Sequence, residues 1–285
     1  MNRSTGPTIG LILPTMGAGA SVEAVEAAAA TASRLGWTDV WAPDHVLVDR
    51  ASADQYGTIL DPIVSLTHVA ARHPDLRIGT AVLVAPMRNA VILAKELATL
   101  DHVSRGRLQV GVGSGRSAGE FANVAPAGRY HERGAYLDET IDLWRHLWSG
   151  TTDPFPGRFH ALNDFAFAPL PPQGAAIPIW VGGKSPAAMR RAARRGDGHL
   201  ASQTSPDELA ERRETLAREA EAAGRPLPRI AARTAVTDAE RIDPTAAVER
   251  IRAYGEAGAE QVVLSFGTTD SEELTAALER LAAAL

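Results

Sequence analysis

Short apolar runs alternate with longer amphipathic stretches along most of this chain. The short runs are rich in β-branched residues and are typical of buried strands, whereas the longer stretches repeat at helical spacing. We expect strands at residues 8–14, 38–43, 76–84, 107–113, 179–182, 198–202, 229–236 and 261–266. We expect helices at 21–35, 61–73, 89–103, 131–148, 205–223, 244–257 and 271–284, and one more that begins at 185.

This order predicts an α/β fold, a (β/α)8 TIM barrel, in one domain over residues 1–285. Parallel strands joined by helices need right-handed crossovers, and eight strand–helix units close naturally into a barrel. An open doubly wound sheet is the alternative. Residues 150–178, after the fourth helix, form an irregular insertion too long for an ordinary connection. We expect it to pass over one end of the barrel as a lid or binding loop, or to pack its phenylalanines onto the barrel.

Composition narrows the classes of function. The net charge of −5 comes from 29 basic and 34 acidic residues without a long block of either sign, which argues against nucleic-acid binding. The chain has no cysteine, and no histidines or carboxylates stand at metal-ligand spacing, so we expect no metal site. The apolar run 9–13 is too short for a signal peptide or a membrane span, so we expect a cytoplasmic protein with no membrane partner.

The motif WAPDHV at residues 41–46 places Asp44 and His45 where a buried strand should stop. Titratable groups are costly to bury in an apolar core, so the pair is expected to face a cleft. The carboxyl ends of barrel strands build the active sites of TIM-barrel enzymes. A capping aspartate beside a solvent-facing histidine is the alternative. A second histidine, His199, lies in an expected strand as either a pocket residue or a core residue.

The fourth strand runs into GVGSGR, which includes Gly113, Ser114, Gly115 and Arg116. Glycines at alternate positions let a ligand approach the backbone closely, and Arg116 adds a fixed positive charge. A tight turn with Arg116 on the surface is the alternative. The motif is not a dinucleotide fingerprint, because the next expected helix begins about fifteen residues later.

The fifth strand runs into WVGGKSP, where Gly182, Gly183, Lys184 and Ser185 lead directly into a helix with Pro186 in its first turn. Free N–H groups, the helix dipole and the lysine together favour an anion such as phosphate. A simple helix cap is the alternative. Phosphate sites in such barrels usually follow later strands, so this place is unusual.

Taken together, these segments resemble the bacterial luciferase-like monooxygenase superfamily, and most closely its branch that uses the deazaflavin coenzyme F420. The resemblance covers nearly the whole chain and is weakest at 150–178 and after 229. It rests on GLILP at 10–14, GWTDVWAPDH at 36–45, the stretch from RIGTAVLVAPMRN to GVGSG across 77–115, and PIWVGGKSPAAMRRAARRGDGH at 178–199.

The resemblance implies a flavin or deazaflavin bound at the carboxyl ends of the strands. In this family a cis peptide on the third strand often supports the ring, and the matching bond is Ala81–Val82. The cofactor phosphate lies near Gly182–Ser185, and the Asp44–His45 pair is typical of the deazaflavin branch and lies beside the reactive ring. Sugar-phosphate dehydrogenases of that branch carry an acid where this chain has Arg116, which argues against a sugar-phosphate substrate.

The leading hypothesis is therefore an oxidoreductase that moves a hydride between coenzyme F420 and a small organic substrate. His45 would act as general acid or base, and Asp44 would orient it or contact the cofactor. A two-component monooxygenase that uses FMN and a non-catalytic flavin-binding protein are the alternatives. The resemblance also suggests a homodimer and a flavin or F420 reductase as partner.

Overall fold

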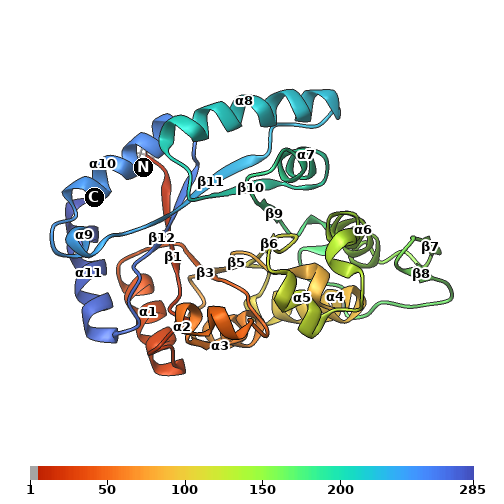
Figure 1. The fold of residues 1–285 in the computed structure, drawn as a ribbon, viewed down its shortest axis with the longest axis horizontal. Coiled ribbons are helices and arrows are strands. Elements are labelled where there is room, and N and C mark those ends of the chain that lie inside the picture. The colour runs from red at the N-terminus through yellow and green to blue at the C-terminus, as the bar shows by residue number, and fades with distance from the viewer. Residues whose placement is uncertain (1–5) are drawn as a thin grey trace.

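Eight parallel strands close into a barrel, and helices surround it on the outside (Figure 1). The computed structural model describes residues 6–285. The strands follow the order β1, β12, β11, β10, β9, β6, β5, β3 around the barrel. Adjacent strands of the barrel therefore belong to consecutive strand–helix units of the chain. The predicted (β/α)8 architecture is confirmed.

The barrel strands lie close to the predicted positions. They are β1 (Thr8–Ile12), β3 (Asp39–Ala42), β5 (Arg77–Thr80), β6 (Leu108–Val112), β9 (Ile179–Gly182), β10 (Gly198–Ser202), β11 (Arg229–Ala235) and β12 (Gln261–Ser265). The main helices are α1 (Val22–Arg34), α3 (Pro62–Arg72), α4 (Ala90–Ser104), α6 (Arg129–Trp148), α7 (Pro186–Arg195), α8 (Pro206–Ala222), α10 (Thr245–Glu256) and α11 (Ser271–Ala284).

The structure adds short elements that the hydrophobic pattern did not predict. They are β2 (Met16–Gly17), η1 (Arg50–Ser52), α2 (Ala53–Tyr56), β4 (Thr58–Ile59), η2 (Ala85–Met87), α5 (Ala118–Val124), β7 (Phe155–Pro156), β8 (Ala161–Leu162), η3 (Gly174–Ala176) and α9 (Asp238–Ile242). Several of them follow the carboxyl ends of β3, β5, β6 and β11, where they are part of the long connections to the next main helix. Within residues 6–285, no helix is both long and apolar enough to cross a membrane.

The inside of the barrel is packed with side chains, so it is not a pore. An apolar cluster fills it, formed by Ile12, Trp41, Ala81, Trp180, Leu200, Ala231 and Val263. Two indole rings are seated over glycines: a Cβ atom at Gly79 would lie 2.3 Å from Trp41 Cε3, and one at Gly198 would lie 2.2 Å from Trp180 Cε3. A ligand can therefore bind at an end of the barrel but not inside it.

The 150–178 insertion lies along the outer side of α6 and not over an end of the barrel (Figure 1). Strands β7 and β8 form a hairpin whose turn donates three backbone N–H groups to the Glu139 carboxylate of α6, at 2.7–2.8 Å. Phe155, Phe159, Phe165 and Phe167 pack against the main core. The packing alternative is therefore confirmed for the phenylalanines, and the lid expectation was wrong.

Candidate functional site

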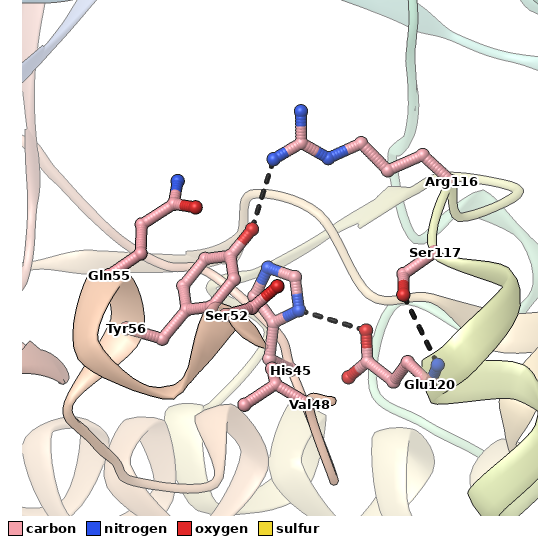
Figure 2. A pocket seen from close by; sticks show the side chains of 8 residues that line it. All are labelled: His45, Val48, Ser52, Gln55, Tyr56, Arg116, Ser117 and Glu120. Atoms are coloured by element: carbon pink, nitrogen blue, oxygen red, sulfur yellow. Dashed lines mark hydrogen bonds and ion pairs between the residues drawn. The ribbon is translucent and has the colours of Figure 1, made fainter. Parts of the chain in front are cut away.

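A histidine and a glutamate face each other beyond the carboxyl end of β3. The Nδ1 atom of His45 lies 3.0 Å from Oε2 of Glu120, and Oε1 of the same carboxylate accepts the backbone N–H of Val46 at 2.8 Å. Figure 2 shows the two side chains turned toward one another at the edge of a cavity. The Glu120 side chain is 3% exposed and that of His45 is 18% exposed. A buried carboxylate on Nδ1 fixes the orientation of the imidazole and leaves Nε2 free for a ligand.

Glu120 comes from α5, a helix that the sequence analysis did not predict. The helix begins at Ala118, soon after Arg116, so the expectation of a long loop after GVGSGR was wrong. Ser117 is its N-cap and accepts the backbone N–H of Glu120 at 3.1 Å. The cap fixes the first turn of the helix, and the carboxylate of its third residue lies on His45 and Val46 instead of returning to the N-cap N–H as in a capping box. The Ser-x-x-Glu pattern was the one signal in the sequence that could have revealed the residue.

A tyrosine and an arginine complete the wall of this cavity. The ring of Tyr56, at the end of α2, lies 4.2 Å from the His45 ring, centroid to centroid. Arg116 donates from Nη2 to the Tyr56 hydroxyl at 3.0 Å, as Figure 2 shows. The cavity has a volume of about 280 Å³ and is also lined by the polar side chains of Ser52 and Gln55. This volume suits a small organic molecule that contacts His45.

Asp44 is buried and does not contact His45 through a hydrogen bond. It accepts the backbone N–H of Val84 at 2.9 Å and pairs with Arg88 at 2.6 Å, and Arg88 reaches Asp61 at 3.0 Å. Burial alone would lower the pKa of Arg88, but its hydrogen bonds to the two carboxylates and their charges raise it. Asp44 therefore ties the end of β3 to the segment after β5, and Glu120 takes the orienting place beside His45.

The peptide bond between Ala81 and Val82 is cis, as the resemblance implied. The Val82 side chain lies over the glycines of the two neighbouring strand ends. A Cβ atom at Gly113 would lie 2.7 Å from Val82 Cγ2, and one at Gly182 would lie 2.9 Å from Val82 Cγ1. These glycines thus make room for Val82, which forms an apolar shelf at the mouth of the barrel.

A methyl group at Gly182 should displace this shelf. We expect Gly182→Ala to lower the free energy of unfolding by about 1–3 kcal/mol, the usual cost of overpacking, and to weaken cofactor binding. Val64→Ala on α3 is the control, because the Val64 side chain is 71% exposed and alanine favours a helix. Denaturant titration of both variants tests this. Equal stability and equal cofactor affinity in the two variants would contradict it.

The turn from β9 into α7 is exposed and carries unused backbone donors. Gly183 has φ +120°, and Ser185 caps α7 by accepting the N–H of Ala188 at 3.2 Å. Lys184 donates to the carbonyl of Gln203 at 2.6 Å. Across the described chain, the backbone N–H groups of Lys184 and Ser185 reach no protein acceptor. This arrangement suits an anionic oxygen-bearing group.

His199 is a core residue and not a pocket residue. It is fully buried on the outer side of β10, where its Nδ1 lies 3.0 Å from the carbonyl oxygen of Val181. Burial lowers its pKa to about 4, against the opposite effect of that hydrogen bond. In residues 6–285, no group of three histidines or carboxylates could hold a metal ion.

The lowered pKa of His199 predicts a pH-dependent stability. The unfolded histidine titrates near 6.5, so between about 4 and 6.5 the unfolded chain binds the extra proton. The contribution of neutral His199 to the free energy of unfolding should be fully present above this window. As the pH falls inside the window, it should decrease by about 1.4 kcal/mol for each pH unit. His199→Phe should flatten the slope measured by denaturation between about pH 7 and about pH 5. An unchanged slope in the variant would contradict the assignment.

Comparison with known proteins places the chain in one family. The profile of the luciferase-like monooxygenase family matches residues 9–284. An F420-dependent glucose-6-phosphate dehydrogenase of Amycolatopsis mediterranei is 33% identical over 177 residues, which cover 60% of this chain and 51% of that protein. The match therefore spans about half of that relative's length. An uncharacterised protein of Mycobacterium tuberculosis is 30% identical over 275 residues, 91% of this chain and 93% of that protein.

Solved structures share the fold at lower identity. An F420-dependent secondary alcohol dehydrogenase, solved with an F420–acetone adduct, has a TM-score of 0.79 at 18% identity, covering 96% of this chain and 98% of that one. The oxygenating constituent of 3,6-diketocamphane monooxygenase from Pseudomonas putida, in complex with FMN, has a TM-score of 0.77 at 17% identity and covers 98% of both chains. Because the family profile matches nearly the whole barrel, the chain belongs to the luciferase-like monooxygenase family.

Proposed function

We propose that this protein is an oxidoreductase that transfers a hydride between coenzyme F420 and a small alcohol, ketone or enone. The observation that carries the proposal is the His45–Glu120 pair, which points an imidazole with a free Nε2 into a cavity at the carboxyl ends of the strands. Hydride transfer to or from a carbonyl carbon requires a proton at the oxygen, and this pair can supply or remove it. The F420-dependent dehydrogenases among its relatives support the choice of cofactor.

The ring of the cofactor would lie at the mouth of the barrel, on Ala81 and Val82. The Val82 side chain presents an apolar surface there, and Gly113 and Gly182 keep it in place because a side chain at either position would displace it. Ser114 follows directly and is partly exposed. We assign these residues to the deazaflavin ring. When bound, the cofactor supplies the hydride chemistry, and the protein supplies orientation and electrostatics.

The phosphate of the cofactor would be held at the start of α7. The unused N–H groups of Lys184 and Ser185, the helix dipole and the Lys184 ammonium all favour negative charge there. Gly183 permits the turn, since its φ of +120° is unfavourable for residues with a side chain. Lys184→Ala would therefore lower the affinity for the cofactor more than it would slow the proton transfer at His45.

The proton step belongs to His45 and its neighbours. Glu120 accepts from Nδ1, so Nε2 faces the cavity and can hold the proton that the substrate oxygen gains or loses. The buried carboxylate also offsets the positive charge that forms on the ring when both nitrogens carry protons. Tyr56 packs against one side of the imidazole and limits its rotation. Gly115, with φ +74°, leads into Arg116, whose guanidinium donates to the Tyr56 hydroxyl in the wall of the cavity.

Single-turnover spectroscopy tests this function. The protein is loaded with F420 and mixed without oxygen with a panel of secondary alcohols, and the reduced cofactor is mixed with ketones and enones. The proposal expects cofactor absorbance to change with at least one member of the panel, and to depend on substrate concentration. Cofactor that binds but reacts with no member would favour a non-catalytic binding protein.

A monooxygenase that uses reduced FMN is the second candidate. It is favoured by the family to which the chain belongs and by the FMN-bound diketocamphane monooxygenase that shares its fold. Such an enzyme would depend on a reductase partner for its reduced flavin. Oxygen consumption with chemically reduced FMN and a ketone, above the rate of the free flavin, would support this candidate over hydride transfer.

A homodimer also remains a prediction, which sedimentation of the full chain would test.

A further inference from the structure

One cation inside the mouth of the barrel has no anionic partner. Arg233 lies on β11, where its register neighbours are Ser202 of β10 and Val263 of β12. Side chains alternate along a strand, and Ala231 belongs to the interior cluster, so Arg233 also points inward. It is closer to the carboxyl end of the strand than Ala231 and therefore lies on top of the apolar filling.

The arginine crosses the barrel. Strand β11 and strand β5 stand opposite each other in the closed order of strands. Arg233 Nη1 nevertheless donates to the carbonyl oxygen of Ala81 at 3.0 Å, directly after β5. The guanidinium therefore spans the mouth and forms the floor between the apolar interior and the shelf made by Val82.

Within residues 6–285, no carboxylate compensates the charge of this guanidinium. Arg233 makes no ion pair there, and its hydrogen bond is the one to Ala81. Burial lowers its pKa, and no carboxylate opposes that effect. By contrast, the buried guanidinium of Arg191 on α7 is paired with Asp138 at 2.7 Å. Arg233 is partly buried, and a partly buried charge without a carboxylate partner is costly, so its retention points to a ligand that supplies the missing partner.

We propose that Arg233 is an anion-binding group at the floor of the barrel mouth, and that its unused N–H groups receive a planar, delocalised anion. A guanidinium presents donors in a fixed fork that matches two oxygens, or an oxygen and a nitrogen, in one plane. Two sources offer this chemistry: a carboxylate on the substrate, or the pyrimidine edge of the deazaflavin ring when reduction makes it electron-rich. The second source rests on the proposed function, whereas the first does not.

The test compares Arg233→Gln with wild type and with Arg229→Gln. Arg229 begins the same strand, is 44% exposed and pairs with Glu260, so it controls for loss of an arginine on β11. One arm titrates the full chain with pyruvate, with acetone as the uncharged match, by calorimetry. The other arm titrates it with oxidised and with reduced F420 by fluorescence and absorbance, which also gives the midpoint potential of the bound cofactor.

We expect at least a tenfold weaker Kd for one probe in Arg233→Gln and no change in Arg229→Gln. Loss of pyruvate binding alone assigns the anion to the substrate. A selective loss of reduced F420, with a lowered midpoint potential, assigns it to the ring. If F420 does not bind the wild type, the proposed function fails but the pyruvate arm still decides the inference.

Unchanged Kd values for both probes in folded Arg233→Gln would overturn the proposal and leave the arginine a packing element. If that variant does not fold, the side-chain N–H signals of Arg233 in wild type decide the question by NMR, with Arg233→Lys used to identify them. Shifts of these signals on adding either probe support the proposal. Signals that do not move at saturating pyruvate and F420 overturn it.

Discussion

Replacing His45 by alanine is expected to lower turnover by about a hundredfold or more while F420 still binds with an affinity near that of wild type. The reason is that the variant removes the one imidazole that faces the cavity, whereas the Val82 shelf and the start of α7 remain intact. Stopped-flow turnover and fluorescence titration on the same preparation measure the two quantities separately.

Two further variants sharpen this result. Glu120→Gln keeps the size of the side chain but removes its charge, so turnover should fall by roughly tenfold or more, with a shift in the pH profile that a purely structural residue would not produce. His131→Ala, on the exposed surface of α6, is the matched control and should behave as wild type. Wild-type turnover in His45→Ala would remove this residue from the mechanism.

Replacing Asp44 by alanine is expected to cost about 3–5 kcal/mol of stability. The change leaves the Arg88 guanidinium, whose side chain is only 18% exposed, with Asp61 as its one remaining carboxylate, and it leaves the N–H of Val84 without its acceptor. Denaturant unfolding of the full chain measures this loss. An exposed aspartate, Asp153, is the control, since its removal should change stability by less than about 0.5 kcal/mol.

A double variant separates the charge from the packing. In Asp44→Ala with Arg88→Met, the uncompensated cation is gone, so part of the lost stability should return. A loss of less than about 1 kcal/mol in the single variant would show that Asp44 does not hold the segment after β5. Asp44→Asn should be intermediate, because an amide can still accept from Val84 but carries no charge.

The barrel could be predicted from the sequence because each strand and many helices carry a local signal, and these signals recur along the chain. Each strand is a short apolar run, and several helices carry their own start signal, as Asp61 does for α3 and Ser205 does for α8. The strand end that bears His45 was predicted for the same reason: a titratable pair directly after a buried run must lie near an opening. These features need no knowledge of what packs against them.

The partner of His45 could not be predicted in the same way. Glu120 lies 75 positions away in the chain, on a seven-residue helix in a segment of alanine and glycine with little periodicity. Asp44 stands next to His45 in sequence and was therefore the natural choice, but adjacent residues on an extended chain point in opposite directions. Proximity in sequence favoured the wrong carboxylate.

Arg233 was missed because one charge in a strand is ambiguous until the inward face is known. The run IAARTAV gives no alternation of apolar and polar residues strong enough to assign a face. The insertion was misplaced for a related reason: its phenylalanines fit a lid or a packed loop equally well. Their packing against the core and the contact of Glu139 with the hairpin turn decide between the two.

The most direct test of the account is a parallel titration of the purified protein with coenzyme F420 and with FMN, followed by fluorescence. The F420-dependent relatives and the His45–Glu120 pair lead us to expect that F420 binds more tightly than FMN, and the anion site at the start of α7 predicts that Lys184→Ala weakens that binding. Tighter binding of FMN, with oxygen consumption by the reduced flavin, would contradict the account and identify a monooxygenase.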